Sequence, residues 1–177
     1  MLIYSNPVSL DGYIAGPDGD FAWSRPDEEV HRFHNEQARE LDAQLLGRRL
    51  YETMVYWERD DPNWGLVSRE WAEIWRALPK VVFSRTLQSV EGNARLATGT
   101  VAEEIPDDKV VAIGGATLAA SAIDLIDEFR LIVYPVAVGG GTPFFPPGTR
   151  IDLELVETRT FGSRVMYLRY RRDRGDG

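Results

Sequence analysis

Short apolar runs alternate along the chain with longer stretches in which apolar residues recur every three or four positions. The short runs are typical of strands buried inside a sheet, and the longer pattern is typical of helices that cover a sheet on one side. The strand-like runs lie at residues 2–8, 43–46, 80–83, 93–97, 110–113 and 129–138, the last interrupted by Pro135. The helix-like stretches lie at residues 26–40, 48–55, 66–78 and 116–123, with a shorter helical turn at 100–105.

The order of these elements predicts the class of fold. Strands alternate with helices over most of the chain, and each connection is long enough for a crossover between parallel strands. Two late runs, at residues 151–157 and 165–172, have no helix between them and predict an antiparallel pair. The pattern therefore predicts an α/β fold whose mostly parallel central sheet has an antiparallel edge. No stretch has the composition of a linker, so residues 1–177 are predicted to form a single domain.

Composition narrows the classes of function. The 177 residues are 44% hydrophobic and 27% charged, as in an ordinary globular protein. The absence of cysteine excludes a disulfide framework, a thiolate nucleophile and any cysteine-ligated metal site. The net charge of -8 argues against non-specific binding to nucleic acid or to anionic membranes. The first residues do not resemble a signal peptide, and no apolar run approaches the ~20 residues of a membrane span, so a cytoplasmic protein is expected.

One strand-like run ends in a pair of glycines, and much of the functional prediction depends on it. Residues 110–113 are apolar, Gly114 and Gly115 follow, and a helix with small side chains comes next. Glycines let a ligand approach the backbone, and the first amides of a helix are unpaired and favour an anion. The motif predicts a phosphate site. A plain strand-to-helix turn is the alternative, because neither a GxGxxG nor a P-loop fingerprint is present.

Two other turns also follow directly after a strand. Residues 47–49 (Gly-Arg-Arg) follow the run 43–46, and residues 84–86 (Ser-Arg-Thr) follow the run 80–83. If the strands are parallel, all three turns lie at the carboxyl edge of the sheet, where open α/β sheets bind ligands. The arginines can pair with phosphate oxygens, and two separated phosphate sites predict a dinucleotide with an extra phosphate, NADPH before NADH. The alternative is that the arginines are surface residues and the serine is a cap.

Four short strings resemble the dihydrofolate reductase-like family in their residues, order and spacing, and the resemblance, with a fifth string, covers nearly the whole chain. They are 9–15 (SLDGYIA), 46–52 (LGRRLYE), 82–86 (VFSRT) and 113–116 (IGGA). The fifth, 139–145 (GGGTPFF), matches the branch that contains the C-terminal reductase domain of bacterial riboflavin biosynthesis. The resemblance implies a sheet of about eight strands with helices on both faces and NADPH at its carboxyl edge. It also implies hydride transfer to a pterin-like, pyrimidine-like or sugar-derived substrate.

The resemblance also assigns residues to the cofactor. It implies that the adenosine 2′-phosphate side is held by Gly47, Arg48, Arg49, Ser84 and Arg85. It implies that the pyrophosphate is held by Gly114, Gly115, Ala116 and Thr117. The expected protein is an NADPH-dependent oxidoreductase similar to dihydrofolate reductase or to 5-amino-6-(5-phosphoribosylamino)uracil reductase. The alternative is a nucleotide- or flavin-binding module of the same fold without turnover.

The same resemblance places the nicotinamide across the first strand, near residues 8–14, with a small-molecule substrate beside it. The side chains that would face the substrate are Asp11, Tyr13, Trp23, Asp27, Glu28 and Glu29. Dihydrofolate reductases keep one acid on the following helix that pairs with the pterin ring, and Asp27, Glu28 and Glu29 are all candidates for it. Acids are also common in a first helical turn, because the helix dipole favours them there. No arginine clearly matches the one that binds the folate glutamate tail.

Asp11 and two histidines have both functional and structural interpretations. Asp11 either shapes the turn at Gly12 or contacts the substrate and relays a proton through water. His31 and His34 could be drawn as metal ligands, but helical surface histidines are commoner and no further ligand is evident, so no metal is predicted. Residues 139–141, all glycine, predict a loop with unusual backbone dihedral angles. The tryptophans either form a lid over a planar substrate or pack in the core; they are Trp57, Trp64, Trp71 and Trp75.

The late strands predict an assembly. They carry Val165, Tyr167, Leu168 and Tyr170, and an open sheet edge that is rich in large apolar side chains invites pairing. The branch that the chain resembles is generally dimeric. We therefore expect a two-fold symmetric homodimer that packs through the late strands. The alternative is a monomer in which a helix or the basic tail covers that edge.

Overall fold

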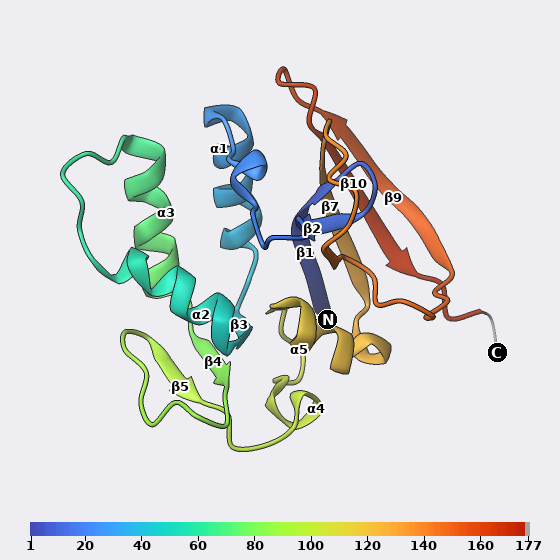
Figure 1. The fold of residues 1–177 in the computed structure, drawn as a ribbon. Helices are drawn as coiled ribbons and strands as arrows, with labels where there is room; N and C mark the ends of the chain where they lie inside the picture. Colours follow the sequence, from blue (N-terminus) through green and yellow to red (C-terminus); the bar gives the residue numbers. More distant parts are fainter. Residues whose placement is uncertain (176–177) are drawn as a thin grey trace.

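The computed structural model describes residues 1–175, and eight strands form one sheet in it. The sheet runs in the order β5-β4-β3-β6-β1-β7-β10-β9 (Figure 1). Its strands are β1 (Leu2–Ser9), β3 (Ala43–Gly47), β4 (Lys80–Phe83), β5 (Ala94–Leu96), β6 (Val111–Gly114), β7 (Glu128–Tyr134), β9 (Leu153–Thr160) and β10 (Met166–Arg172). Two further strands, β2 (Tyr13–Ala15) and β8 (Thr142–Pro143), pair with each other as a small antiparallel ribbon.

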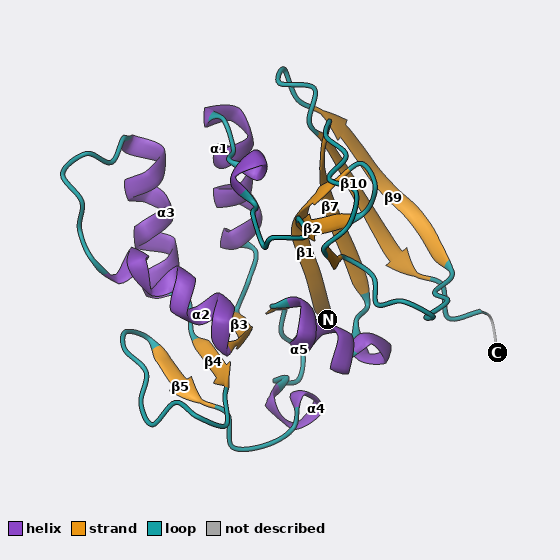
Figure 2. Cartoon of the chain, viewed as in Figure 1, coloured by secondary structure: helices purple, strands orange, loops and turns teal. Residues whose placement is uncertain are grey.

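Helices connect most of the parallel strands, as Figure 2 shows. The α-helices are α1 (Glu28–Arg39), α2 (Arg48–Met54), α3 (Leu66–Ala77), α4 (Val101–Glu104) and α5 (Ala116–Ser121). Short 3-10 helices are η1 (Ala22–Ser24), η2 (Val55–Glu58) and η3 (Ile123–Leu125). The predicted alternation of strands and helices is therefore confirmed. In the described part of the chain, no helix is both long enough and apolar enough to cross a membrane.

The strand directions confirm the predicted mixed sheet. β1 pairs in parallel with β6 and β7, β3 pairs in parallel with β4 and β6, and β4 pairs in parallel with β5. β10 is antiparallel to both β7 and β9, which makes the predicted antiparallel edge. The carboxyl ends of β4, β3, β6 and β1 therefore lie along the same edge of the sheet, and the turns that follow them are neighbours.

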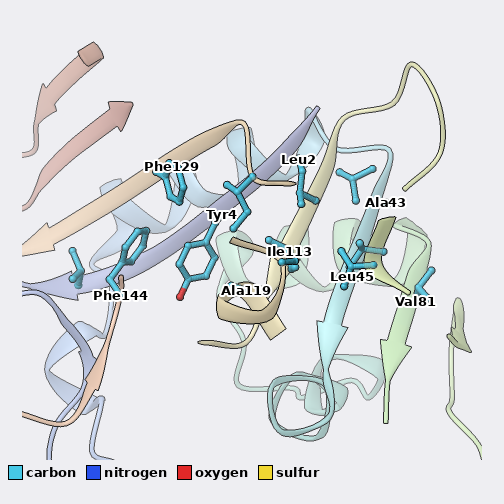
Figure 3. Packing of buried hydrophobic residues seen from close by; sticks show 14 residues of the cluster. Leu2, Tyr4, Ala43, Leu45, Val81, Ile113, Ala119, Phe129 and Phe144 are labelled. Atoms are coloured by element: carbon cyan, nitrogen blue, oxygen red, sulfur yellow. The ribbon is translucent and has the colours of Figure 1, made fainter. Parts of the chain in front are cut away.

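Side chains alternate along the strands between two buried layers, one on each face of the sheet. On one face Leu2 and Ile113 pack with Val101 of α4 and Ala119 of α5. Figure 3 shows part of this layer, with labelled side chains from β1, β3, β4, β6 and β7 turned toward α5. On this face, α4 and α5 therefore confirm the predicted helices.

The opposite face is covered by α1 and α3. Ile132 of β7 packs against Val30 of α1, and Val82 of β4 packs against Trp75 of α3. Trp75 is only 1% exposed, so it belongs to the core and not to a substrate lid. Burial of one such large apolar side chain contributes about 1.5–3 kcal/mol, and the two layers together hold the sheet edge in place.

Three local features differ from the sequence prediction or add to it. The run at 129–138 ends as a strand at Tyr134, because Pro135 cannot donate to a ladder. The polar stretch after α2 begins with the 3-10 turn η2 and not with a loop. The β2–β8 ribbon shows no alternation in its sequence because its strands are so short. It requires Gly141, where φ is +118° and a Cβ would lie 2.1 Å from the carbonyl oxygen of Ala15.

The late strands turn their large side chains differently from the prediction. Val165 and Tyr167 are 3% and 1% exposed, because they face α1 and pack with Phe33. They cannot form an interface without displacing that helix. The half-exposed apolar side chains of this region are Leu155 and Val156 of β9 and Met166 of β10. The register of β10 against β7 and β9 places Leu155 and Met166 on the face away from α1.

Candidate cofactor and substrate site

The turns after β3 and β6 are packed directly against each other. Gly115 has φ +96°, and a Cβ there would lie 3.5 Å from both Cα and N of Gly47. A Cβ on Gly114 would lie 2.5 Å from Cδ2 of Leu50, the third residue of α2. The glycine pair therefore has a structural reason, since it lets the two turns meet. The same arrangement leaves bare backbone on the surface that they share, and it brings together two of the three turns that the sequence predicts.

The turn after β4 joins this surface through one hydrogen bond. The guanidinium of Arg48 donates to Thr86 Oγ1 over 3.2 Å. Ser84 Oγ accepts from the backbone N–H groups of Thr86 and Leu87 at 3.2 and 3.0 Å, so this hydroxyl shapes the turn. Arg85 and Arg48 are both exposed. The predicted 2′-phosphate residues thus lie on adjacent strand ends, and their guanidinium groups are accessible to an anion.

The helix after the glycine pair is shorter than the sequence suggests. α5 spans Ala116–Ser121, and its first internal hydrogen bond runs from Ala119 N to Gly115 O over 2.9 Å. The amides of Ala116, Thr117 and Leu118 precede that bond and belong to the open end of the helix. With so few residues the helix dipole is small, so anion binding here depends mainly on these backbone donors and on the neighbouring arginines.

An apolar cleft of about 350 Å³ lies beside the arginine turns, between the end of β4 and the helices α4 and α5. Its lining includes Phe83, Thr100, Val101, Leu118 and Ser121. A cleft next to a predicted 2′-phosphate site suits the flat face of a nucleotide base. The sequence analysis predicts a helical turn here but no ligand site. The available signal was the capping box formed by Thr100 and Glu103, which fixes the start of α4 beside the cleft.

Glu104 holds the backbone at one wall of this cleft. Its carboxylate accepts hydrogen bonds from the N–H groups of Thr98 and Gly99 at 2.7 and 3.1 Å and pairs with Arg95. The hydrogen bond from Arg95, helped by these amides, lowers the pKa of Glu104 to about 2. The carboxylate is therefore ionised at neutral pH and keeps residues 98–100 in the conformation that lines the cleft.

The central strand β1 has an open edge on the side of the glycine turn. β1 pairs with β6 only from Leu2 to Tyr4, whereas its pairing with β7 continues to Ser9. Pro7, which has no N–H to donate, lies in the part beyond β6. Ser5 is exposed although β1 is a central strand, so the helix layer is open above it. Further along the chain, Val8 and Ser9 are buried, and residues 8–14 are where the nicotinamide is expected.

The carboxylate of Asp11 links two loops beside this opening through hydrogen bonds. Its carboxylate accepts from Ser9 Oγ at 2.6 Å and from the backbone N–H groups of Val138 and Gly139 at 3.1 and 2.7 Å. These hydrogen bonds, with that of Ser9 the largest, lower the pKa of Asp11. Of the two interpretations, the structure supports the one in which Asp11 shapes the chain. Tyr13 lies in β2 and pairs with Pro143, so it belongs to the ribbon that Asp11 helps to anchor.

The three candidate acids at the start of α1 all have structural partners. Asp27 is the N-cap, and its Oδ1 accepts from Val30 N at 2.8 Å. Glu28 pairs with Arg32 one turn later. Glu29 accepts from Gly162 N at 2.9 Å and faces Arg159. Glu28 and Glu29 thus serve the helix and the loop before β10, and only Asp27 of the three also lines a pocket.

That pocket has a volume of about 270 Å³ and lies between the start of α1, the end of β7 and the loop before β10. It brings together Trp23 and Asp27, as the sequence analysis expects, and adds Arg25, Tyr134 and Ser163. The Trp23 and Tyr134 rings meet edge to face, with centroids 6.0 Å apart. Asp11 and Tyr13 are not part of its lining. Sequence reasoning missed Tyr134 because a tyrosine at the end of a buried strand is typical of core packing.

The remaining aromatic candidates form a separate cluster. Trp57 lies 4.9 Å from Trp64 and 6.4 Å from Trp71, measured between ring centroids, and all three are half-buried. His31 packs against Trp71, and burial lowers the pKa of His34 to about 4. Among residues 1–175, no three histidine, aspartate or glutamate side chains converge on a point where they could hold a metal ion.

The family model described as the RibD C-terminal domain matches residues 1–108 and 100–167, which together make up most of the chain. The chain belongs to the RibD C-terminal domain family. Two Bacillus subtilis members, the uncharacterized proteins YyaP and YwjB, are 32% and 30% identical to it. The alignment with YyaP covers 96% of this chain and 93% of YyaP, and the alignment with YwjB covers 89% and 90%.

Two solved structures share the fold of this RibD C-terminal domain. A putative riboflavin biosynthesis protein from Shewanella sp. PV-4 has a TM-score of 0.75 and 23% identity, with 98% of this chain and 99% of that one covered. The Thermotoga maritima diaminohydroxyphosphoribosylaminopyrimidine deaminase/5-amino-6-(5-phosphoribosylamino)uracil reductase has a TM-score of 0.68 and 17% identity. The match covers 98% of this chain and 56% of the Thermotoga protein, so the chain spans about half of that longer protein. The chain therefore has the fold of these RibD-like proteins.

Proposed function

We propose that this RibD C-terminal domain is an NADPH-dependent reductase that transfers a hydride to a small heterocyclic or sugar-derived substrate. The observation that carries the proposal is the meeting of three strand-end turns on one sheet edge. A Cβ on Gly115 would lie only 3.5 Å from Gly47, so these two turns are close neighbours, and Arg48 is hydrogen-bonded to Thr86. The name of the Thermotoga protein that shares the fold includes a 5-amino-6-(5-phosphoribosylamino)uracil reductase, which agrees with this function.

The residues present fit a dinucleotide with an additional phosphate. Arg48 and Arg85 would pair with the 2′-phosphate, since guanidinium groups bind phosphate oxygens in a bidentate manner. The cleft beside them would take the adenine, and the bare backbone at Gly115 with the first amides of α5 would take the pyrophosphate. When bound, the cofactor supplies the hydride from its nicotinamide ring.

The other residues would position the substrate and exclude water. The open edge of β1 beyond Tyr4 lies between the glycine turn and the pocket at Trp23 and Asp27. A ring that enters from this side would be held by the pocket, while Asp11 keeps the neighbouring glycine loop closed against β1. The two reactants would then lie on the two sides of one strand, which fixes their relative orientation.

A titration with NADPH tests the proposal directly. Binding is expected to quench tryptophan fluorescence, because Trp23 lines the pocket in which the substrate would lie and responds to a nicotinamide beside it. Oxidation of the cofactor with candidate acceptors is then followed through the loss of the reduced-cofactor absorbance. If millimolar NADPH does not bind, the proposal is wrong.

A nucleotide- or flavin-binding module without turnover is the second candidate. It is favoured by one observation, namely that all three acids at the start of α1 have structural partners. Binding of NADPH without oxidation by pterin, pyrimidine or sugar-derived acceptors would support the module. Oxidation with any one of them would support the reductase.

A further inference from the structure

The loop that carries Arg85 receives no support from its own backbone. From Arg85 to Glu91, no backbone group is hydrogen-bonded to another backbone group among the described residues. Side chains hold the loop instead, beginning with the Ser84 hydroxyl, which accepts from the amides of Thr86 and Leu87. A loop of this kind opens locally at small cost unless side chains fix it, because opening breaks few hydrogen bonds.

One helix holds both ends of this loop. Arg48 and Tyr51 are three residues apart in α2, so they lie on the same face of the helix. Arg48 donates to the Thr86 hydroxyl at 3.2 Å, and the Tyr51 hydroxyl accepts from the Glu91 amide at 2.7 Å. The same hydroxyl donates to the Glu91 carbonyl oxygen at 3.4 Å. Two side chains of α2 therefore fix the two ends of the segment 86–91.

The ring of Tyr51 is fixed in the core beneath the loop. Tyr51 is 4% exposed and belongs to the buried cluster that contains Trp75 of α3. Leu87 and Val90 of the loop are partly buried against the same cluster. The core thus presents the Tyr51 hydroxyl at a set position, and its two bonds to Glu91 determine where the loop lies on α2.

The loop is also confined where it leaves Tyr51. Gly92 has φ +71°, and a Cβ there would lie 2.4 Å from the carboxyl group of Glu58. Glu58 is itself held by Trp75, whose indole N–H donates to Oε1 at 2.9 Å. Because residue 92 has so little room, movement of a released loop is taken up between Arg85 and Glu91.

We propose that Tyr51 is a positioning residue for the turn that carries Arg85, and that its hydroxyl thereby sets the affinity for the 2′-phosphate of NADPH. The part of the inference that concerns NADPH rests on the proposed function. Tyr51 acts on the cofactor only through the turn. When the loop leaves its position for part of the time, only the remaining fraction of the protein is ready to bind, and the apparent dissociation constant rises in proportion.

Tyr51→Phe tests the inference, because it removes the hydroxyl and keeps the ring in the core. NADPH is expected to bind about three- to ten-fold more weakly, as the loss of one hydrogen bond between uncharged groups implies. The affinity for NADH, which lacks the 2′-phosphate, should stay at the wild-type value. Tyr167→Phe is the matched control, because it removes a buried phenol hydroxyl that is bonded to Gln37 of α1, and it should change neither affinity.

A double substitution shows whether Tyr51 acts through Arg85. The charge that the turn supplies is absent in Arg85→Ala, so the addition of Tyr51→Phe should weaken NADPH no further. If the two losses add, Tyr51 acts by another route and the inference is overturned.

Amide hydrogen exchange in the absence of nucleotide gives an independent readout. Tyr51→Phe should speed exchange at Thr86 and Leu87 as well as at Glu91, although the hydroxyl is bonded to Glu91 and not to them. Faster exchange at Glu91 alone, or exchange that does not change, overturns the inference because the hydroxyl then has only a local role.

The titrations separate this inference from the proposed function. If wild-type protein binds NADPH and Tyr51→Phe binds it equally well, or loses NADH to the same extent, the role of Tyr51 is refuted and the reductase is not. If wild-type protein does not bind NADPH, the reductase and the cofactor part of the inference are both refuted. Exchange at Thr86 and Leu87 then still decides whether Tyr51 positions the turn.

Discussion

Arg48 donates a hydrogen bond to Thr86 across 3.2 Å, and this contact joins the turn after β3 to the turn after β4. The two residues are separated by a helix, a 3-10 turn and a second helix in the chain. They meet because β3 and β4 are adjacent parallel strands that end at the same level, with Gly47 in register with Phe83. The guanidinium is thereby positioned before any ligand arrives.

Removal of either arginine should weaken the binding of NADPH much more than the binding of NADH. Arg48→Ala and Arg85→Ala are each expected to weaken NADPH by roughly ten- to a hundred-fold, because a charge-assisted contact to phosphate is worth about 1.5–3 kcal/mol. Affinity for NADH should change little, since NADH lacks the 2′-phosphate. Fluorescence titration with both cofactors measures the ratio. Arg150→Ala, an exposed arginine before β9, is the control, and equal losses for both cofactors would show that the arginines do not contact the 2′-phosphate.

Glu104 should make the stability of the protein sensitive to acid. Its pKa is lowered from 4.5 to about 2, chiefly by Arg95, so the folded state binds this proton more weakly than the unfolded state. The resulting stability is fully present above about pH 4.5 and is lost as the pH falls toward 2. Glu104→Gln should reduce the free energy of unfolding at pH 7 by about 1–3 kcal/mol and flatten this part of the pH profile. Urea unfolding at several pH values measures both, with Glu73→Gln on α3 as the control.

The same variant should also affect the cofactor. Because Glu104 holds the amides of Thr98 and Gly99 beside the apolar cleft, its loss should weaken NADPH and NADH alike. An equal loss of affinity for both cofactors in Glu104→Gln differs from the selective loss of NADPH affinity expected for Arg48→Ala. If both cofactors bind Glu104→Gln as they bind the wild type, the cleft does not hold the base.

Asp11 should control the glycine loop. Asp11→Ala removes the acceptor for the Val138 and Gly139 amides, so both amides should exchange with solvent faster and the melting temperature should fall. Hydrogen exchange followed by NMR measures the two amides individually. Asp18→Ala, whose carboxylate bonds only within its own turn, is the control and should leave Val138 and Gly139 unchanged. If the Val138 and Gly139 amides of Asp11→Ala exchange at the wild-type rate, Asp11 does not hold the glycine loop.

We predict a homodimer, with an interface on the face of the late strands away from α1. Leu155 and Met166 are 51% and 41% exposed there, and such a face is normally covered. Light scattering at micromolar concentration should give twice the 20.0 kDa of one chain. Leu155→Lys together with Met166→Lys should yield monomers that still bind NADPH, since the three turns come from one chain. Leu66→Lys, at an exposed leucine of α3, is the control, and a wild-type mass near 20.0 kDa would refute the dimer.

The sequence predicted the sheet well because its strands are buried on both faces. Residues 80–83 are a strand with the predicted bounds, and α3 ends within one residue of the prediction. Short continuous apolar runs flanked by glycine and proline indicate buried strands and fit few other secondary structures. The pattern could not show which face a late strand turns to α1, because a period of two fits either face equally well, so the burial of Val165 and Tyr167 against α1 was not predicted.

The candidate site was predictable only where it consists of turns. The glycine and arginine turns follow strands directly, so parallel topology alone brings them together. The role of Asp27 as both helix cap and pocket wall depends on where α1 begins relative to β7, which no local pattern encodes. Tyr134 is the clearest case. Its hydroxyl is noticed only because the folded chain offers it no partner.

The early end of β6 has a mechanical consequence. Because β1 and β6 share register only from Leu2 to Tyr4, the sheet is joined across its centre by a short seam, while β1 and β7 are joined along the whole strand. The half that carries the arginine turns and the half that carries the pocket are therefore joined across this seam mainly by buried side chains from both halves, among them Val81, Ile113 and Phe129. A bound dinucleotide that reaches both halves would add a further connection across the seam.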